Sequence, residues 1–272
     1  MKIYQYTNIE SLAYILKNRS IRFNRLDKVD DIEEGHLESL GVQFCKYVFV
    51  SCWTESEEES IPLWKMYGGD KGGVRIGLEQ QMFKEYLIDN RSLNKHNVAG
   101  SIVSMIPPRD MLSPDYFFMP FTNYDNDMFY RRINYVDDVA KYTKDAITLS
   151  NIDGDRGNMT LSTKPFGYYK HKRWAFQNES RFVLYVLPIN PLLEGGNPEV
   201  STLVMRSLLD NKQLPFEDYY MYLKDEVINN IEITLSPSAT DAQRILVDSL
   251  VAKYAPHATI RESGLGRLVR LK

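Results

Sequence analysis

The side chains of Gln177 and Glu179 are the best placed in this sequence to do chemistry. They belong to a Gln-Asn-Glu run directly before a strongly apolar segment, so Glu179 is expected at the mouth of a strand. A carboxylate there can stabilise positive charge that develops on a bound substrate. Since Arg181 lies two residues further on, a purely structural salt bridge is the alternative role for Glu179.

Other kinds of catalytic site find little support in the sequence. No HExxH or paired spacing occurs among the histidines His36, His96, His171 and His257. We therefore expect no metal site. The sequence has no GxSxG nucleophile motif, and the glycine-rich run at 68–73 lacks the GK[ST] ending of a phosphate-binding loop. Cys45 and Cys52 form no CxxC pair, which indicates free thiols in a reducing compartment.

The composition is that of an ordinary globular protein. Of the 272 residues, 43% are hydrophobic and 25% charged, and the formal net charge is -3. This balance gives no indication of nucleic-acid binding, although a local basic patch is left open. The N-terminus has no apolar signal core, and no apolar run approaches the roughly 20 residues of a membrane helix. We expect a cytoplasmic protein with no membrane partner, folded as one domain over residues 1–272.

The N-terminal third predicts four strands and two helices around the candidate residues. Strands are expected at residues 3–6, 20–26 and 46–53, with a further one at 74–78. Thr7 and Glu10 have the spacing of a capping box for the first helix. Pro62 suits the first turn of a second, short helix. The acidic residues Asp30, Asp31, Glu33 and Glu34 and the loop at 55–60 are expected to form solvated turns.

The remainder predicts an irregular insertion followed by a more regular C-terminal unit. The insertion spans about 90–120 and is expected to pack through Tyr116, Phe117 and Phe118. A strand is expected at 131–136, a helix at 137–149, a mobile loop at 151–158 and a central strand at 181–187. Residues 231–235, 241–254 and 258–262 predict a closing βαβ unit, with Ile245, Leu246, Leu250 and Val251 on the apolar helix face. The expected fold class is α+β, with a central mixed or antiparallel β-sheet core and flanking helices.

The order of these motifs carries a resemblance to a known family. The segments are YQYT, IRF, DDIEEG, VSCWTE, LWKMYG, GGVRIGL, KxxxWxxQNESRFV and IEITLSPSA. From Tyr4 to about Gly264 the chain resembles a bacterial family of domains of unknown function, family 2971. Two positions depart from that pattern, since Gln5 stands where the family has Lys and Gln177 where it has Glu. The family itself supplies no function.

The layout is also similar to that of ADP-ribosyltransferase folds, which supply the expected activity. That likeness implies an NAD-dependent ADP-ribosyltransferase or NAD glycohydrolase, with NAD as substrate and an acceptor that the sequence does not identify. It implies a catalytic set of Glu179, Gln177 and Tyr67. The side chains that the likeness places around the nucleotide are Tyr4, Gln5, Thr7, Arg22, Ser51, Trp64 and Lys170. Among them, Arg22 or Lys170 would pair with the pyrophosphate, and Trp64 or Tyr67 would stack on nicotinamide.

Two other kinds of function are left open. A metal-dependent nuclease would need Asp31, Glu33 and Glu179 in one coordination sphere, with Lys170 nearby. A non-catalytic module would bind a nucleotide or a protein partner without turnover, for example in phage defence or a toxin system. The departures at Gln5 and Gln177 favour this second alternative.

Overall fold

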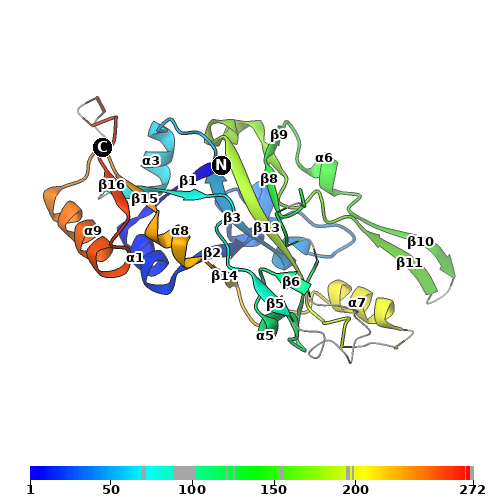
Figure 1. Ribbon diagram of the computed structural model, residues 1–272. Coiled ribbons are helices and arrows are strands. Elements are labelled where there is room, and N and C mark those ends of the chain that lie inside the picture. The colour runs from blue at the N-terminus through cyan, green and yellow to red at the C-terminus, as the bar shows by residue number, and fades with distance from the viewer. Residues whose placement is uncertain are drawn as a thin grey trace.

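A largely antiparallel sheet forms the centre of the computed structural model (Figure 1). The structure describes residues 1–68, 72–88, 102–120, 122–124, 126–153, 156–193, 197, 199–266 and 268–269. Seven strands follow the order β14-β2-β3-β1-β4-β15-β16. Their bounds are Lys2–Asn8 (β1), Ser20–Arg25 (β2), Val48–Thr54 (β3), Gly73–Glu79 (β4), Asp218–Tyr222 (β14), Glu232–Leu235 (β15) and Thr259–Arg261 (β16). The expected α+β class with a mixed or antiparallel sheet is confirmed.

A second set of strands joins the sheet at β3. Strand β13 (Glu179–Leu187) pairs antiparallel with β3 along its length, from Glu179 opposite Thr54 to Tyr185 opposite Val48. The short strands β7 (Phe117–Phe118) and β8 (Tyr130–Arg132) then pair with β13. Because β13 is covered on both faces, its side chains are buried throughout, as the continuous apolar run predicted.

The edge of β3 that does not pair with β13 is shared between β1 and β2, which diverge from each other. Near one end β2 pairs with Phe49 and Val50, and at the other end β1 pairs with Thr54. Within the described residues, no strand pairs with the three positions between, 51–53, on this edge. The sheet therefore forks at β3, and the backbone of residues 51–53 faces the gap between β1 and β2.

The helix α1 (Ile9–Asn18) connects β1 to β2 across this fork. Its N-cap is Asn8, whose side chain accepts a hydrogen bond from the Ser11 N–H at 2.7 Å. The predicted cap at Thr7 is wrong by one residue because Thr7 still pairs with Val74, so β1 extends to Asn8. At the start of β4, a Cβ on Gly73 would lie 2.6 Å from the Thr7 carbonyl oxygen, so this close pairing requires glycine.

The helices and short sheets around the main sheet complete the fold. The other α-helices are α2 (Ile32–Gly35), α3 (Ile61–Tyr67), α5 (Pro108–Met111), α6 (Ala140–Thr143), α7 (Val200–Leu209), α8 (Asp225–Asn229) and α9 (Asp241–Tyr254). Three 3₁₀ helices are η1 (Leu26–Lys28), η2 (Phe44–Tyr47) and η4 (Lys172–Gln177). The two-stranded sheets pair β5 (Tyr86–Ile88) with β6 (Ile102–Ser104), β9 (Asn134–Val136) with β12 (Tyr169–His171), and β10 (Ile147–Asp153) with β11 (Arg156–Leu161). Among the described helices, none has the length and apolar character needed to cross a bilayer.

The C-terminal unit matches the prediction closely. Strands β15 and β16 are parallel and α9 connects them, so the expected βαβ unit is confirmed. The buried side of α9 agrees with the predicted one only in part. Val251 is buried and Leu250 packs against the core as expected, but Val247 is also buried while Ile245 is 63% and Leu246 55% exposed. The helix lies beside α1, at the left of Figure 1.

The middle of the chain departs most from the prediction. The expected helix at 137–149 is only the four-residue α6, since β10 begins at Ile147. Of the expected mobile loop at 151–158, residues 151–153 and 156–158 belong instead to the paired strands β10 and β11, which extend away from the main sheet at the right of Figure 1. Residues 154–155 lie outside the described residues. The strand at 131–136 divides at buried Ile133 into β8 and β9, because one part pairs with β13 and the other with β12. Of the 90–120 insertion, residues 90–101 lie outside the described residues.

Candidate active site

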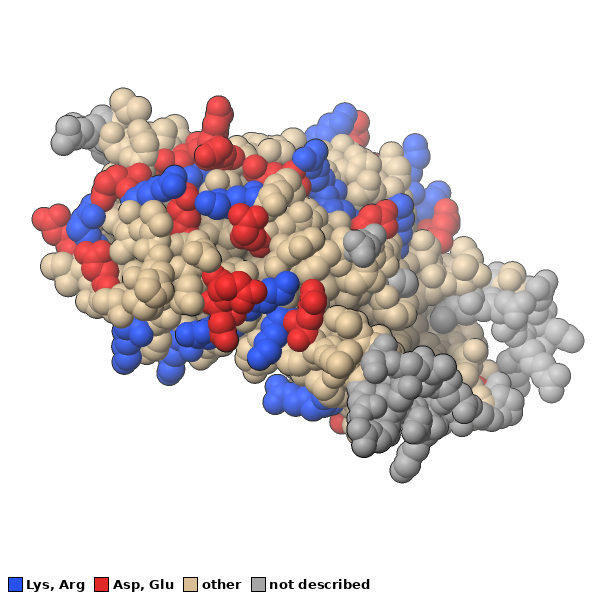
Figure 2. Space-filling model, in the orientation of Figure 1, with Lys and Arg blue, Asp and Glu red and all other residues tan. Residues whose placement is uncertain are grey.

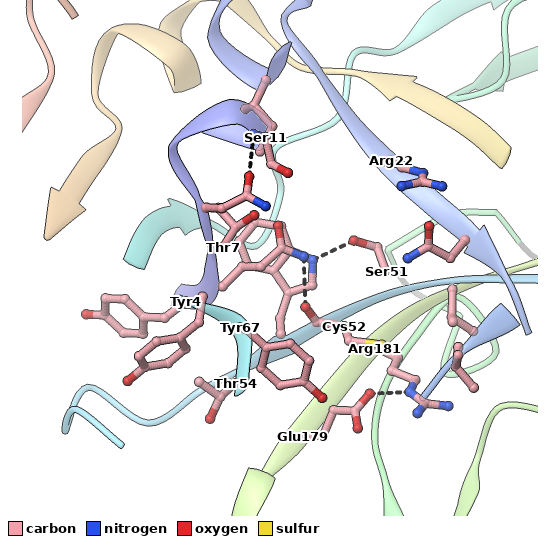
Figure 3. Close-up of a pocket in the computed structure, with 18 of the residues that line it drawn as sticks. Tyr4, Thr7, Ser11, Arg22, Ser51, Cys52, Thr54, Tyr67, Glu179 and Arg181 are labelled. Atoms are coloured by element: carbon pink, nitrogen blue, oxygen red, sulfur yellow. Dashed lines mark hydrogen bonds and ion pairs between the residues drawn. The ribbon is translucent and has the colours of Figure 1, made fainter. Parts of the chain in front are cut away.

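A cavity of about 640 Å³ lies in the fork of the sheet. Strands β1, β2 and β3 line it together with α1, the start of β13 and the residue that ends α3, Tyr67. Figure 3 shows side chains from these elements converging, with Ser51 and Cys52 of β3 between Thr7 of β1 and Glu179 of β13. Nine of the ten residues that the sequence singled out line this cavity: Tyr4, Gln5, Thr7, Arg22, Ser51, Tyr67, Lys170, Gln177 and Glu179.

The Gln-Asn-Glu run turns Glu179 into the cavity through a specific backbone change. Gln177 is the last residue of the 3₁₀ helix η4, and Asn178 takes a left-handed conformation with φ 43° and ψ 53°. Asparagine tolerates this region better than most residues with a Cβ, so the helix can stop and β13 can start at once. The Asn178 carbonyl oxygen accepts a hydrogen bond from the Thr54 hydroxyl at 3.0 Å, which fixes the turn against β3.

The Glu179 carboxylate is held by two cations on the wall of the cavity. Its Oε2 lies 3.0 Å from the Lys170 Nζ, and its Oε1 accepts a hydrogen bond from the Arg181 Nε. The far end of the Arg181 guanidinium binds both oxygens of Glu34, with 3.0 Å from Nη2 to Oε2. Two carboxylates and two cations thus form one buried network with no net charge.

This network sets the protonation states of its members. Burial alone would raise the pKa of Glu179, but the charges of Arg181 and Lys170 outweigh it and lower that pKa to about 2. Burial raises the pKa of Glu34, whose carboxylate is paired with Arg181. Burial and the adjacent Glu179 raise the pKa of the Cys52 thiol, so a nucleophilic Cys52 thiolate is disfavoured. The cavity therefore presents an ionised carboxylate and a neutral thiol at neutral pH.

Hydrogen bonds continue from this network to Tyr67. Lys170 donates to the Gln177 Oε1 at 2.7 Å, and the Gln177 Nε2 donates to the Tyr67 hydroxyl oxygen at 2.8 Å. Burial together with the charge of Asp30, which also lines the cavity, raises the Tyr67 pKa. Gln177 and Tyr67 are therefore fixed as hydrogen-bonding groups beside Glu179.

The other predicted ligand contacts occupy different positions around the cavity. Gln5 bridges the fork, since its Nε2 donates to the Cys52 carbonyl oxygen at 3.0 Å. The Ser51 hydroxyl accepts from the Trp53 Nε1 at 2.9 Å. Arg22 is exposed on β2 and pairs with Asp218 at 2.9 Å. In Figure 3 it lies at the end of the cavity away from Glu179.

Trp64 is the predicted site residue that does not line the cavity. It is buried against Tyr6, with the ring centroids 4.9 Å apart, and its Nε1 donates to the Glu59 carboxylate at 2.8 Å. Glu59 also accepts hydrogen bonds from Ser263 and Gly264. The expectation of a merely solvated loop at 55–60 is therefore wrong for Glu59, which anchors the C-terminal segment.

The acidic turn at 30–34 was also wrongly expected to be solvated throughout. Glu34 is fully buried against Arg181, and buried Asp31 caps α2 by accepting from the Glu33 N–H at 3.2 Å. The signal that could have located this pairing was Arg181 itself. A charged residue inside a continuous apolar strand needs a buried partner of opposite charge.

The arrangement gives no support to a metal-dependent nuclease built on Asp31, Glu33 and Glu179. Within the described residues, no three or more His, Cys, Asp or Glu side chains gather in a way that could hold a metal ion. Acidic and basic residues are interspersed on the face in Figure 2. The charge of that face therefore gives no indication of a nucleic-acid surface.

Comparison with known proteins gives a family match in the middle of the chain. No curated protein and no solved structure matches the chain. Residues 63–182 match the family model described as "Protein of unknown function (DUF2971)". The match is shorter than the Tyr4–Gly264 span of the expected resemblance. It contains Tyr67, Lys170, Gln177, Glu179 and Arg181 but not the β1, β2 and β3 walls of the cavity. Over residues 63–182, the chain is therefore similar to this family of proteins of unknown function.

Proposed function

We propose that this protein is an NAD-cleaving enzyme of ADP-ribosyltransferase-like chemistry, with the nucleotide bound in the fork of the sheet. The observation that carries the proposal is the convergence of an ionised Glu179, Gln177 and Tyr67 on one cavity of about 640 Å³. Small-molecule sites commonly have volumes of roughly 300–1,000 Å³, so the space suits a dinucleotide.

Glu179 has the electronic properties that the chemistry needs. When the nicotinamide–ribose bond breaks, the bonding electron pair leaves with nicotinamide and neutralises its ring, and positive charge develops on the ribose. A carboxylate fixed in its ionised form stabilises that charge most when it peaks, in the transition state. An ionised carboxylate offers about four acceptor positions, and the ion pairs with Arg181 and Lys170 leave capacity for a ribose hydroxyl.

The remaining cavity residues suit the rest of the nucleotide. The partly buried Tyr67 ring is held through its hydroxyl by Gln177, so its face can pack on nicotinamide without losing that anchor. Lys170 is already engaged by Gln177 and Glu179, whereas Arg22 is exposed at the other end of the cavity. Arg22 is therefore the better of the two proposed partners for the pyrophosphate. Water, or a group on an acceptor molecule, would then attack the ribose carbon and release a proton.

The direct test is to incubate the protein with NAD and quantify free nicotinamide by chromatography. Glu179→Gln should reduce kcat/KM by roughly 10²–10³-fold because it removes charge stabilisation from the transition state. Glu232→Gln is the matched control, since Glu232 is also a buried carboxylate paired with two cations, Lys2 and Arg261, but lies outside the cavity. Equal turnover in the wild type and the Glu179 variant would contradict the proposal.

A second candidate is a nucleotide-binding module without turnover. It is favoured by the ion pairs on both Glu179 oxygens, which are also what a purely structural carboxylate would make. The two candidates separate in one experiment, because binding alone raises the melting temperature with NAD concentration while releasing no nicotinamide.

A further inference from the structure

The Glu34 side chain is the part of the buried network that lies furthest from the cavity. Its exposed fraction is 0%, and it does not line the cavity, whereas Glu179 and Arg181 both do. It comes from α2, far from β13 in the sequence, and contacts the site only through Arg181. Burying a carboxylate this completely is costly unless its partner is held in a favourable geometry.

The Arg181 guanidinium divides its donors between the two carboxylates. Its two terminal nitrogens bind the two Glu34 oxygens as a fork, and its Nε alone binds Glu179. Guanidinium and carboxylate groups frequently pair through two parallel N–H···O bonds. Glu34 makes that two-bond pair with Arg181, so Glu179 receives a single bond from the Arg181 Nε and keeps acceptor capacity toward the cavity.

The acidic turn reaches the cavity a second time through Asp30. Asp30 lines the cavity with Tyr67, and its charge adds to burial in raising the pKa of the Tyr67 hydroxyl. Tyr67 connects through Gln177 and Lys170 back to Glu179. Residues 30–34 therefore place one carboxylate near the aromatic side of the site and another on Arg181.

We infer that Glu34 is a positioning residue, which holds the forked end of Arg181 so that Glu179 keeps a free acceptor edge toward the ligand. The expected effect of Glu34 on turnover rests on the proposed function. The expected effect on the geometry of Arg181 and Glu179 is independent of any activity. Without the Glu34 charge, the nearest carboxylate for the Arg181 fork is Glu179. An end-on pair between them would turn both Glu179 oxygens away from the ribose.

The kinetic test compares Glu34→Gln with wild type in the nicotinamide-release assay. The kcat should fall by roughly 10²-fold, as expected for a misplaced reacting group, with little change in the KM for NAD. Glu34→Asp keeps the charge and should recover part of the loss. If Glu34 were solely structural, the loss of kcat in each variant would follow its loss of unfolding free energy. Glu34→Gln and Glu232→Gln would then lower kcat equally whenever urea unfolding shows that they destabilise the protein equally.

Arg181→Lys completes a double-mutant cycle on the same assay. Lysine keeps the charge but cannot fork between two carboxylates, so the single variant should lose kcat as Glu34→Gln does. If Glu34 acts through Arg181, the kcat of the variant that combines Glu34→Gln with Arg181→Lys should be no lower than that of either single variant. Additive losses would overturn the inference.

Crystal structures of the variants test the inference separately from the proposed function. In Glu34→Gln, or in the uncharged and apolar Glu34→Met if the first variant does not fold, the Arg181 terminal nitrogens should move onto the Glu179 carboxylate. An unchanged Glu179 would overturn the positioning role even in an active enzyme. Absence of nicotinamide release by the wild type, together with the expected movement, would refute only the proposed function.

Discussion

Two buried arginines, Arg181 and Arg131, are direct neighbours across β13 and β8 and are accommodated in different ways. Arg181 is neutralised by the Glu34 and Glu179 carboxylates. Arg131 donates to the carbonyl oxygens of Lys164 and Phe166 and to the Tyr185 hydroxyl. Its guanidinium also lies 5.2 Å from the Tyr168 ring centroid. Within the described part of the chain, no carboxylate forms an ion pair with it.

The difference separates a structural arginine from one that belongs to the site. The Arg131 partners are neutral. Burial outweighs the opposing charge of Arg131 and raises the Tyr185 pKa to about 12, so these partners keep one protonation state over the ordinary pH range. The Arg181 partners are titratable carboxylates, and one of them lines the cavity. Neutral carbonyl oxygens are enough to hold a buried arginine in place, as they do at Arg131. The two carboxylates at Arg181 are therefore consistent with a chemical role.

The largest expected difference between Arg181 and Arg131 is in the stability of their variants. Arg181→Met would leave two buried carboxylates without their shared partner and should cost roughly 3–5 kcal/mol of unfolding free energy. Arg131→Met would leave carbonyl and hydroxyl acceptors unpaired, at a cost of about 1–3 kcal/mol. Urea unfolding of both variants measures the two losses. Equal losses would remove the distinction between the arginines.

The next contrast is in pH dependence. Because the folded-state pKa of Glu179 is about 2 against an ordinary value of 4.5, the unfolded chain binds its proton first as the pH falls. The stability from ionised Glu179 is therefore complete above pH 4.5 and is lost as the pH falls toward 2. The full contribution is on the order of 3 kcal/mol.

Urea unfolding at pH 6 and pH 3 can measure this effect. The stability difference between wild type and Glu179→Gln should shrink at the lower pH, whereas the difference between wild type and Arg131→Met should stay constant. A loss for Glu179→Gln that is independent of pH would show that its carboxylate is not held in the ionised form.

The smallest contrast concerns the hydroxyl beside Arg131. Tyr185→Phe removes the group that accepts from Arg131 and donates to the Phe166 carbonyl oxygen at 3.0 Å. We expect a stability loss of roughly 1–2 kcal/mol and no change in nicotinamide release, since Tyr185 does not line the cavity. A marked loss of turnover in this variant would extend the site to the Arg131 side of the sheet.

The sequence by itself determined the elements whose signals are local. The period-two runs of β2 and β4, the apolar runs of β3 and β13, Pro62 at the start of α3 and the capped helix at Asp241–Tyr254 all lie where expected. Hydrophobic periodicity and turn or capping residues act over a few neighbouring residues. Elements with these signals can therefore be predicted without knowledge of the fold. The grouping of Tyr67, Gln177 and Glu179 was expected from the likeness to ADP-ribosyltransferase folds and not from a local signal.

Only the tertiary structure decided which partners the charged side chains meet. Glu34 and Arg181 are 147 positions apart, and nothing local distinguishes Glu34 from the exposed Glu33 beside it. The same holds for Trp64, whose side chain lies against Tyr6 and Glu59 rather than in the cavity. Burial and long-range pairing depend on how the sheet forks at β3, and that fork arises from contacts between strands that are distant in sequence.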